Sequence, residues 1–315
     1  MAVVLAETLI RSIVPTKTDD PKLLTLESDS PDGRWASHRL AASQTAVHGG
    51  QKVSINQWGC RDDEFAETPD PKQYPNGRIL VTGDSFVYGD GVAQDETVSA
   101  QLQKSCSKDL EVINCGQWGH NTVDTFMLYQ KELIRFKAST VLHVYVLNDA
   151  ECTSFCDSKP PVSNETPNRL RESLTQRSLF LKFLFSRWDS LKPSRNSFNY
   201  YDWAFTHENK GWEISKRYLK KLAEITQENR QKLIVAIFPL MADFRAYPMT
   251  KAHQTILAAC HELKIECVDL LPAFQSQPIS ASRLHAQLMD SHPNKTAYRI
   301  AAEYLKSRIA GCESH

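Results

Sequence analysis

Residues 78–89 read Arg78-Ile79-Leu80-Val81-Thr82-Gly83-Asp84-Ser85-Phe86-Val87-Tyr88-Gly89, and this stretch decides the fold class. The apolar run from Ile79 to Thr82, rich in β-branched residues, predicts a short strand. Gly83 then permits a turn that a side chain would obstruct, so that Ser85 is lifted out of the strand. A helix that begins near Ser85 would point free N–H groups at its hydroxyl, which suits a nucleophile or an oxyanion. The same turn is also compatible with a phosphate site or a plain loop.

From residue 79 onward, short apolar strands alternate with amphipathic helices. Strands are predicted at 79–82, 110–114, 140–147, 233–238 and 265–270. Apolar stripes at helical spacing predict the helices: Val98, Leu102 and Cys106; Val123, Phe126, Met127, Leu133 and Ile134; Ile214, Tyr218, Leu222 and Ile225; Ile256, Leu257, Cys260 and Leu263; Tyr298, Ala301, Ala302, Leu305 and Ile309. This alternation predicts an α/β fold, a three-layer α/β/α sandwich around a mainly parallel five-stranded sheet. Ligands bind such sheets beyond the carboxyl ends of the strands.

Two segments depart from this alternation. Residues 1–77 are interpreted as an N-terminal extension that wraps a main domain at 78–315, because 16–77 are rich in Asp, Pro, Ser and Gly. Within the extension, the run Val53 to Arg61 alternates and ends in a turn. Residues 151–212 are too long for one crossover and predict an insertion rich in aromatic residues. Those aromatics are interpreted either as the insertion's own core or as a wall over the strand ends.

Composition excludes some classes of protein. The chain has 315 residues, and 41% of them are hydrophobic, so it is long and apolar enough to bury a large core. It has 37 basic and 37 acidic residues. It has no basic run, so nucleic acid is not predicted as a partner. The eight cysteines form no Cys-x-x-Cys pair, so neither a zinc ribbon nor a thioredoxin-type motif is predicted. No metal or cofactor is predicted. Most cysteines are predicted to be buried thiols, and Cys152 and Cys156 either form a disulfide or are two unpaired thiols.

The N-terminal residues do not indicate in which cellular compartment the protein acts. The apolar run from Met1 to Arg11 has no basic region before it, and Glu7 interrupts it well short of the ~20 residues of a membrane span. Neither a signal peptide nor a transmembrane helix is predicted. The run is compatible with an amphipathic first helix of a cytoplasmic protein, or with the end of an anchor on an extracytoplasmic one.

Polar residues follow several of the predicted strands and could form a serine hydrolase site. Ser85 is the predicted nucleophile, His292 the base that takes its proton, and Asp290 the residue that holds the imidazole. The Ser85 N–H, the Gly119 N–H and the Asn148 amide are predicted to bind the oxyanion. Taken singly, His292 is also compatible with a helix cap, Asn148 with a turn and Gly119 with a tight loop. Their order along the chain favours the catalytic interpretation.

These residues resemble the blocks of the SGNH hydrolase superfamily, the GDSL-like esterases. The first block is matched by Gly83-Asp84-Ser85 followed by Tyr88-Gly89, the second by Asn114 and Gly119, the third by Leu147-Asn148-Asp149, and the last by Asp290 and His292 before a C-terminal helix. The resemblance covers about 78–150 and 230–310, and Asn56, Gly59 and Arg61 resemble the segment before the serine in bacterial members. It implies a flavodoxin-like fold and a metal-independent esterase or deacylase acting on a small-molecule or carbohydrate ester, with a short-chain acyl group.

Two departures from the family pattern keep alternatives open. The usual acid lies three residues before the histidine, whereas Asp290 lies two before His292, a spacing that resembles the polysaccharide O-acetyltransferase-like branch as well as some esterases. Leu147 stands where the third block normally has glycine. The alternatives are an O-acyltransferase on the same fold, a non-catalytic carbohydrate-binding member, and a nucleotide-binding domain that uses residues 83–91 as a phosphate loop. No Gly-Lys-Ser/Thr follows those glycines, which argues against the last.

Overall fold

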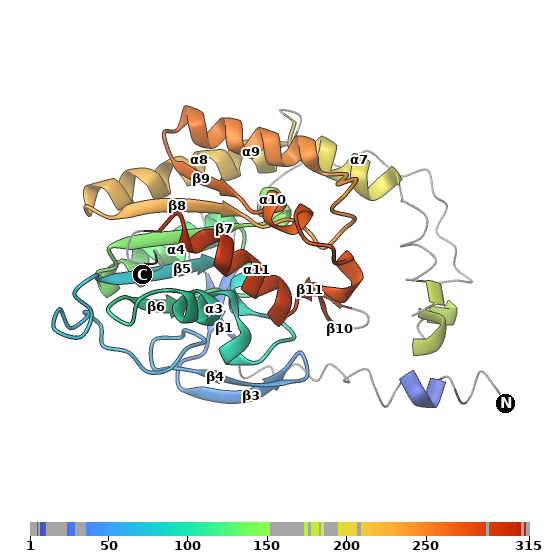
Figure 1. The fold of residues 1–315 in the computed structure, drawn as a ribbon, viewed down its shortest axis with the longest axis horizontal. Coiled ribbons are helices and arrows are strands. Elements are labelled where there is room, and N and C mark those ends of the chain that lie inside the picture. Colours follow the sequence, from blue (N-terminus) through green and yellow to red (C-terminus); the bar gives the residue numbers. More distant parts are fainter. Residues whose placement is uncertain are drawn as a thin grey trace.

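The computed structural model describes residues 5, 7–10, 24–28, 36–151, 173–175, 178–182, 184–185, 195–206, 209–287, 290–309 and 312. At its centre is a five-stranded parallel sheet with the order β6-β5-β7-β8-β9 (Figure 1). Its strands are β5 (Arg78–Gly83), β6 (Glu111–Asn114), β7 (Thr140–Tyr145), β8 (Lys232–Ile237) and β9 (Glu266–Asp269). This order is that of flavodoxin-like folds, and the predicted α/β class and all five predicted strands are confirmed.

Helices cover both faces of the sheet. α3 (Val98–Ser105) packs on α11 (Lys295–Lys306), whereas α4 (Thr122–Lys131) packs on α8 (Lys210–Glu228), and α9 (Thr250–Glu262) lies against β8 and β9. The chain crosses from β5 to β6 in one direction and from β6 to β7 and β8 in the other. Because such crossovers are right-handed, α3 and the α4–α8 pair cover opposite faces. The helices predicted from their apolar stripes therefore form the two outer layers of the sandwich.

Shorter elements connect these layers. They are α2 (Ser85–Tyr88), η2 (Gln94–Glu96), η3 (Leu133–Phe136), η4 (Leu147–Ala150), α7 (Arg195–Ala204), α10 (Leu271–Gln275) and η5 (Ala281–Arg283), with the hairpin of β10 (His285–Gln287) and β11 (Asp290–Pro293). The central strand β5 is buried along its whole length, as a parallel strand covered on both faces requires. At its start the buried Arg78 guanidinium donates hydrogen bonds to Glu111 and to the carbonyls of Ala66 and Phe136.

The described part of the N-terminal extension consists mainly of two hairpins. β1 (Leu24–Ser28) pairs with β2 (Ala36–Leu40), and β3 (Gln44–His48) pairs with β4 (Gln51–Ile55). In β4, Val53 and Ile55 are buried while Lys52 and Ser54 are exposed, so the alternation predicted for this run is confirmed. The following turn joins the main domain through the buried Arg61, which donates to the carbonyls of Tyr88, Gly89 and Val92.

Two disulfides correct the prediction that most cysteines are thiols. Cys60 is bonded to Cys115 and Cys106 to Cys312, pairs separated by 55 and 206 residues in sequence. Such pairs meet only when the tertiary structure brings their elements together, so no local spacing reveals them. Cys260 is a buried free thiol, as predicted, and Cys267 is a free thiol that is only half-buried. Cys152 and Cys156 lie outside the described residues.

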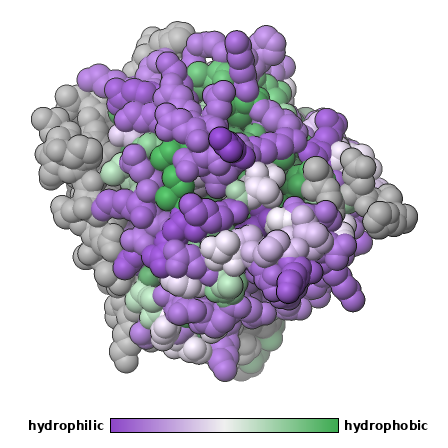
Figure 2. All heavy atoms as spheres, turned by 90° about the vertical axis from the view of Figure 1, so that its left-hand side faces the viewer, coloured by the Kyte–Doolittle hydropathy of each residue, from purple (hydrophilic) through white to green (hydrophobic). Residues whose placement is uncertain are grey.

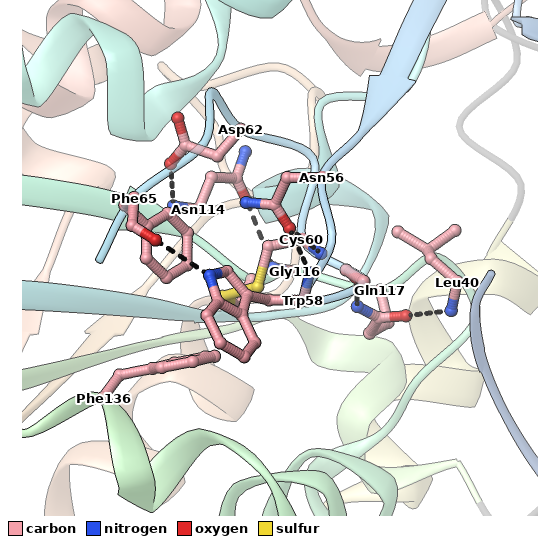
Figure 3. The surroundings of a disulfide bond; sticks show 12 residues. Leu40, Asn56, Trp58, Cys60, Asp62, Phe65, Asn114, Gly116, Gln117 and Phe136 are labelled. Carbon is pink, nitrogen blue, oxygen red and sulfur yellow. Dashed lines mark hydrogen bonds between the residues drawn. A yellow bond between two sulfur atoms is a disulfide. The ribbon is translucent and has the colours of Figure 1, made fainter. Parts of the chain in front are cut away.

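The disulfide Cys60–Cys115 joins the turn after β4 to the loop after β6 (Figure 3). Around it, the Asn56 amide oxygen accepts the N–H groups of Trp58 and Cys60, and the Asp62 carboxylate accepts the Asn114 N–H at 2.6 Å. The extension is therefore fastened to the sheet both covalently and by buried hydrogen bonds, next to the loop that carries Gly119.

No helix among the described residues is long and apolar enough to cross a membrane. The strands begin at the left of Figure 1, and Figure 2 shows this face to be predominantly hydrophilic with small, scattered apolar patches. The carboxyl ends of the strands, and with them β10 and β11, lie at the opposite side of the molecule (Figure 1).

Candidate active site

Ser85 is the first residue of α2 and directly follows the turn at the end of β5. Gly83 has φ +152°, and a Cβ there would lie 2.7 Å from both the Val144 carbonyl oxygen and a Val87 methyl group, so only glycine fits. Asp84 caps the helix, since its carboxylate accepts the Phe86 N–H at 2.9 Å. The predicted glycine turn and the helix start at Ser85 are confirmed.

The structure brings Ser85, His292 and Asp290 into one hydrogen-bonded chain. Ser85 Oγ lies 2.9 Å from His292 Nε2, and His292 Nδ1 lies 2.5 Å from Asp290 Oδ1. The serine and the histidine are 207 residues apart in sequence, and they meet because the β10–β11 hairpin folds back over the carboxyl end of β5. This is the arrangement in which an imidazole can take a proton from the hydroxyl while a carboxylate orients the ring.

The two-residue spacing between Asp290 and His292 has a structural reason. Both residues lie on β11, and side chains two apart on a strand point to the same side. The Asp290 carboxylate also accepts the backbone N–H of His292 at 3.1 Å, which fixes it against the ring. Asp290 therefore reaches the imidazole without the three-residue spacing that is usual in the family it resembles.

Three carboxylates surround the imidazole and govern its charge. Burial by itself would lower the pKa of His292, but the hydrogen bond to Asp290 and the negative charges of Asp290, Asp90 and Asp84 raise this pKa above 6.5. The imidazolium form is thereby stabilised, as a base that receives the serine proton requires.

The predicted oxyanion donors follow three adjacent strands of the sheet: Ser85 follows β5, Gly119 follows β6 and Asn148 follows β7. The Asn148 amide donates to Asp84 Oδ2 at 3.0 Å, so the residue before Ser85 orients this side chain. The Ser85 N–H and the Gly119 N–H donate to no acceptor in the described part of the chain. Such N–H groups are suited to receive a developing negative charge.

The loop that carries Gly119 packs against α2. Gly116 leaves no room for a side chain, because a Cβ there would lie 2.5 Å from the Tyr88 nitrogen, and the Gln117 N–H donates to the Gly83 carbonyl at 3.0 Å. The Gln117 side chain joins this loop to the N-terminal extension: it accepts the Leu40 N–H (Figure 3) and donates to the Gly59 carbonyl. Gly119 itself has φ +73°, a conformation that favours glycine.

Asp84 has a second function that the sequence interpretation missed. Besides capping α2, its carboxylate holds Asn148 and lies close to the buried Asp149. Burial raises the pKa of Asp84, and burial together with the charge of Asp84 raises the pKa of Asp149 well above its usual value. The signal available in the sequence was the Asp directly before a predicted helix start, which is typical of an N-cap.

The insertion reaches the vicinity of the site through α7. Phe205 and Trp212 are buried, and Tyr200, Tyr201 and Trp203 are half-buried against the core, which agrees with a core-packing role. Both tyrosine side chains hydrogen-bond to Glu151, three residues after Asn148. Two further aromatic residues of the predicted insertion, Phe183 and Trp188, lie outside the described residues. Whether the tyrosines bind substrate stays a prediction.

Replacing Asn148 with alanine is expected to lower turnover on a short-chain ester by about 10²- to 10³-fold, as loss of one oxyanion donor does elsewhere. The measurement is kcat for the purified variant, with circular dichroism to show that it is folded. The control variant is Asn229→Ala, at the exposed C-terminal end of α8. Gln117→Ala is not suitable as a control, because Gln117 holds the neighbouring loop in place. Unchanged kcat in a folded Asn148 variant would make this amide purely structural.

Comparisons with known proteins give low similarities. No protein-family model matches the chain, and no curated protein matches it. A G-D-S-L family protein from Desulfitobacterium hafniense DCB-2, described as lipolytic, is 15% identical with a TM-score of 0.46, over 74% of this chain and 100% of its own.

Two further solved structures are similar to the same extent. LAE5, an alpha/beta hydrolase from the metagenome of Lake Arreo in Spain, is 14% identical with a TM-score of 0.47, over 76% of this chain and 97% of its own. The acetylxylan esterase Axe2 from Geobacillus stearothermophilus is 14% identical with a TM-score of 0.45, over 74% and 94%. At identities this low and TM-scores below 0.5, the function has to be argued from the site itself.

Proposed function

We propose that this chain is a serine esterase or deacylase of the SGNH hydrolase type, which cleaves an O-acyl ester through an acyl-enzyme. The observation that carries the proposal is the bridge made by His292, whose two ring nitrogens lie 2.9 Å from Ser85 Oγ and 2.5 Å from Asp290 Oδ1. The resemblance of the sequence blocks to the SGNH hydrolases supports it. So does the position of the site at the carboxyl ends of β5 and β7, where the strand order reverses.

In the proposed acylation step, Ser85 Oγ attacks the acyl carbon as its proton passes to His292 Nε2. Asp290 accepts the Nδ1–H of the ring and stabilises the imidazolium that forms. The negative charge on the former carbonyl oxygen is held by the Ser85 and Gly119 N–H groups and the Asn148 amide. The imidazolium then gives its proton to the departing alcohol, which leaves the acyl group on Ser85.

Deacylation repeats these steps with water as the nucleophile. His292 takes a proton from the water, hydroxide adds to the acyl carbon, and collapse of the intermediate returns the proton to Ser85 Oγ and releases the acid. If a sugar hydroxyl takes the place of water, the same residues perform acyl transfer. Hydrolysis and transfer differ in the acceptor and not in the triad.

The test is labelling of the protein with a fluorophosphonate, which reacts with activated serines, followed by peptide mapping. Label on Ser85 is the expected result, and its absence in folded protein would overturn the proposal. A panel of p-nitrophenyl esters, assayed with and without a sugar acceptor, then distinguishes hydrolysis from transfer. Transfer would appear as an acylated sugar and a faster release of p-nitrophenol when the acceptor is present.

Activity is expected to rise with pH through a midpoint above 6.5. His292 must be neutral to accept the serine proton, and its pKa is raised, so the inactive imidazolium persists to higher pH than for an unperturbed histidine. The measurement is kcat/KM for an uncharged ester between about pH 5 and 9. A midpoint below 6.5, or a flat profile, would argue against His292 as the base.

The two disulfides support a working environment outside reducing cytosol. Disulfides form and persist in oxidising compartments, and both described here join distant parts of the chain. We therefore propose that the protein acts in such a compartment.

A further inference from the structure

Asp90 is a second carboxylate beside the imidazole of His292. One Asp90 oxygen, one Asp290 oxygen and one His292 nitrogen lie within 4.8 Å of one another. Asp90 is 7% exposed, and its backbone N–H donates to the Ser85 carbonyl at 3.1 Å. The nucleophile and this carboxylate therefore sit at the two ends of the same short turn, so that their separation is fixed by the backbone of α2.

The N-terminal extension supplies a partner for this carboxylate. His48, at the end of β3, places its Nε2 3.3 Å from Asp90 Oδ1. The His48 ring stacks on Trp118, with centroids 4.4 Å apart and planes 7° from parallel, and meets the Tyr88 ring edge-on. Trp118 precedes Gly119, so His48 contacts both the carboxylate and the loop that carries a predicted oxyanion donor.

The packing around Asp90 leaves little freedom for its carboxylate. A Cβ on Gly49 would lie 2.5 Å from Asp90 Oδ1, and a Cβ on Gly91 would lie 2.9 Å from the Ala286 methyl on β10. The Gln287 side chain, also on β10, donates to the Gly49 carbonyl. The β3–β4 turn and the β10–β11 hairpin thus enclose Asp90 from two sides.

We propose that Asp90, held by His48, is a positioning residue that stabilises the positively charged form of His292 while the serine proton is in transfer. This inference rests on the function proposed above. It gives the N-terminal extension a part in the chemistry, because the histidine that fixes Asp90 comes from outside the sheet.

The charges around both groups agree with this role. His292 faces the carboxylates of Asp290, Asp90 and Asp84. Asp90 faces His48, His292 and Asp290, with the Arg61 guanidinium and the Tyr298 hydroxyl also nearby. Burial by itself would raise the pKa of Asp90, but the neighbouring His48 and the charge of His292 hold this pKa below 3.8. Asp90 is therefore ionised throughout the range in which His292 titrates.

The test is Asp90→Asn, which removes the charge and keeps the shape. Loss of one nearby negative charge should move the midpoint of the kcat/KM profile about one pH unit lower and reduce the high-pH plateau about tenfold. The pH dependence of fluorophosphonate labelling at Ser85 should show the same shift. If Asp90→Asn does not fold, Asp90→Ser, equally neutral and smaller, replaces it.

The matched control is Asp269→Asn. Asp269 forms the same kind of pair, accepting from His253 Nδ1 at 2.8 Å, at the end of the edge strand β9. Its substitution should leave the midpoint unchanged. A wild-type midpoint in the Asp90 variant, or an equal shift in the Asp269 variant, would overturn the inference. Failure of wild-type protein to label at Ser85 is a different result, because it overturns the proposed function.

Discussion

Replacing Ser85 with alanine is expected to lower kcat on a short-chain ester by about 10⁶-fold, the size of loss seen when a triad serine or histidine is removed elsewhere. The hydroxyl that lies 2.9 Å from His292 is the atom to which the acyl group would be attached, so the variant has no nucleophile. His292→Ala should lose a similar factor. The measurement is kcat, together with the absence of fluorophosphonate label on the Ser85→Ala variant.

A matched control is Ser99→Ala on α3. Its hydroxyl is buried and has no hydrogen-bond partner in the described part of the chain, so its removal should change neither folding nor kcat. If the Ser85 variant retains wild-type turnover after contaminating esterases are excluded, the acyl-enzyme mechanism at this residue is wrong.

Asp290→Asn is expected to lower kcat by about 10⁴-fold while the fold stays intact, as in other triads whose aspartate is replaced by its amide. The Asp290 carboxylate accepts a hydrogen bond from the Nδ1–H of His292, and this leaves Nε2 free to accept the serine proton. An amide that donates to Nδ1 would favour the opposite tautomer, with the proton on Nε2. The measurement is kcat for the variant, with its melting temperature as the check on folding.

The size of this loss also distinguishes the two carboxylates beside the imidazole. A loss below about tenfold would mean that Asp290 is not the residue that fixes the tautomer. The double variant Asp290→Asn/Asp90→Asn then provides the comparison. If Asp90 adds charge independently of Asp290, as proposed, the double variant should lose about tenfold more activity than the single Asp290 variant.

Much of the fold followed from local patterns in the sequence. All five strands of the sheet and the five long helices that cover it were predicted, because apolar periodicity over a few residues is a property of neighbours along the chain. The turn at Gly83 and the helix start at Ser85 were predicted for the same reason. Asp290 and His292 were paired from their place before the C-terminal helix, as in the last block of the family that the sequence resembles. They contact each other because side chains two apart on strand β11 point to the same side.

Contacts between distant segments were decided by the tertiary structure alone. The disulfides Cys60–Cys115 and Cys106–Cys312, the hydrogen bond from Asn148 to Asp84, and the approach of His48 to Asp90 all depend on strand order and on how the N-terminal hairpins pack. A side chain that acts through such a contact carries no periodicity or spacing of its own, so the sequence showed Asp90 only as one more residue after a glycine. The sequence by itself therefore determined the sheet, its helices and the identity of the proposed triad. The tertiary structure decided what surrounds the triad, because charge and hydrogen bonding act through space and not along the chain.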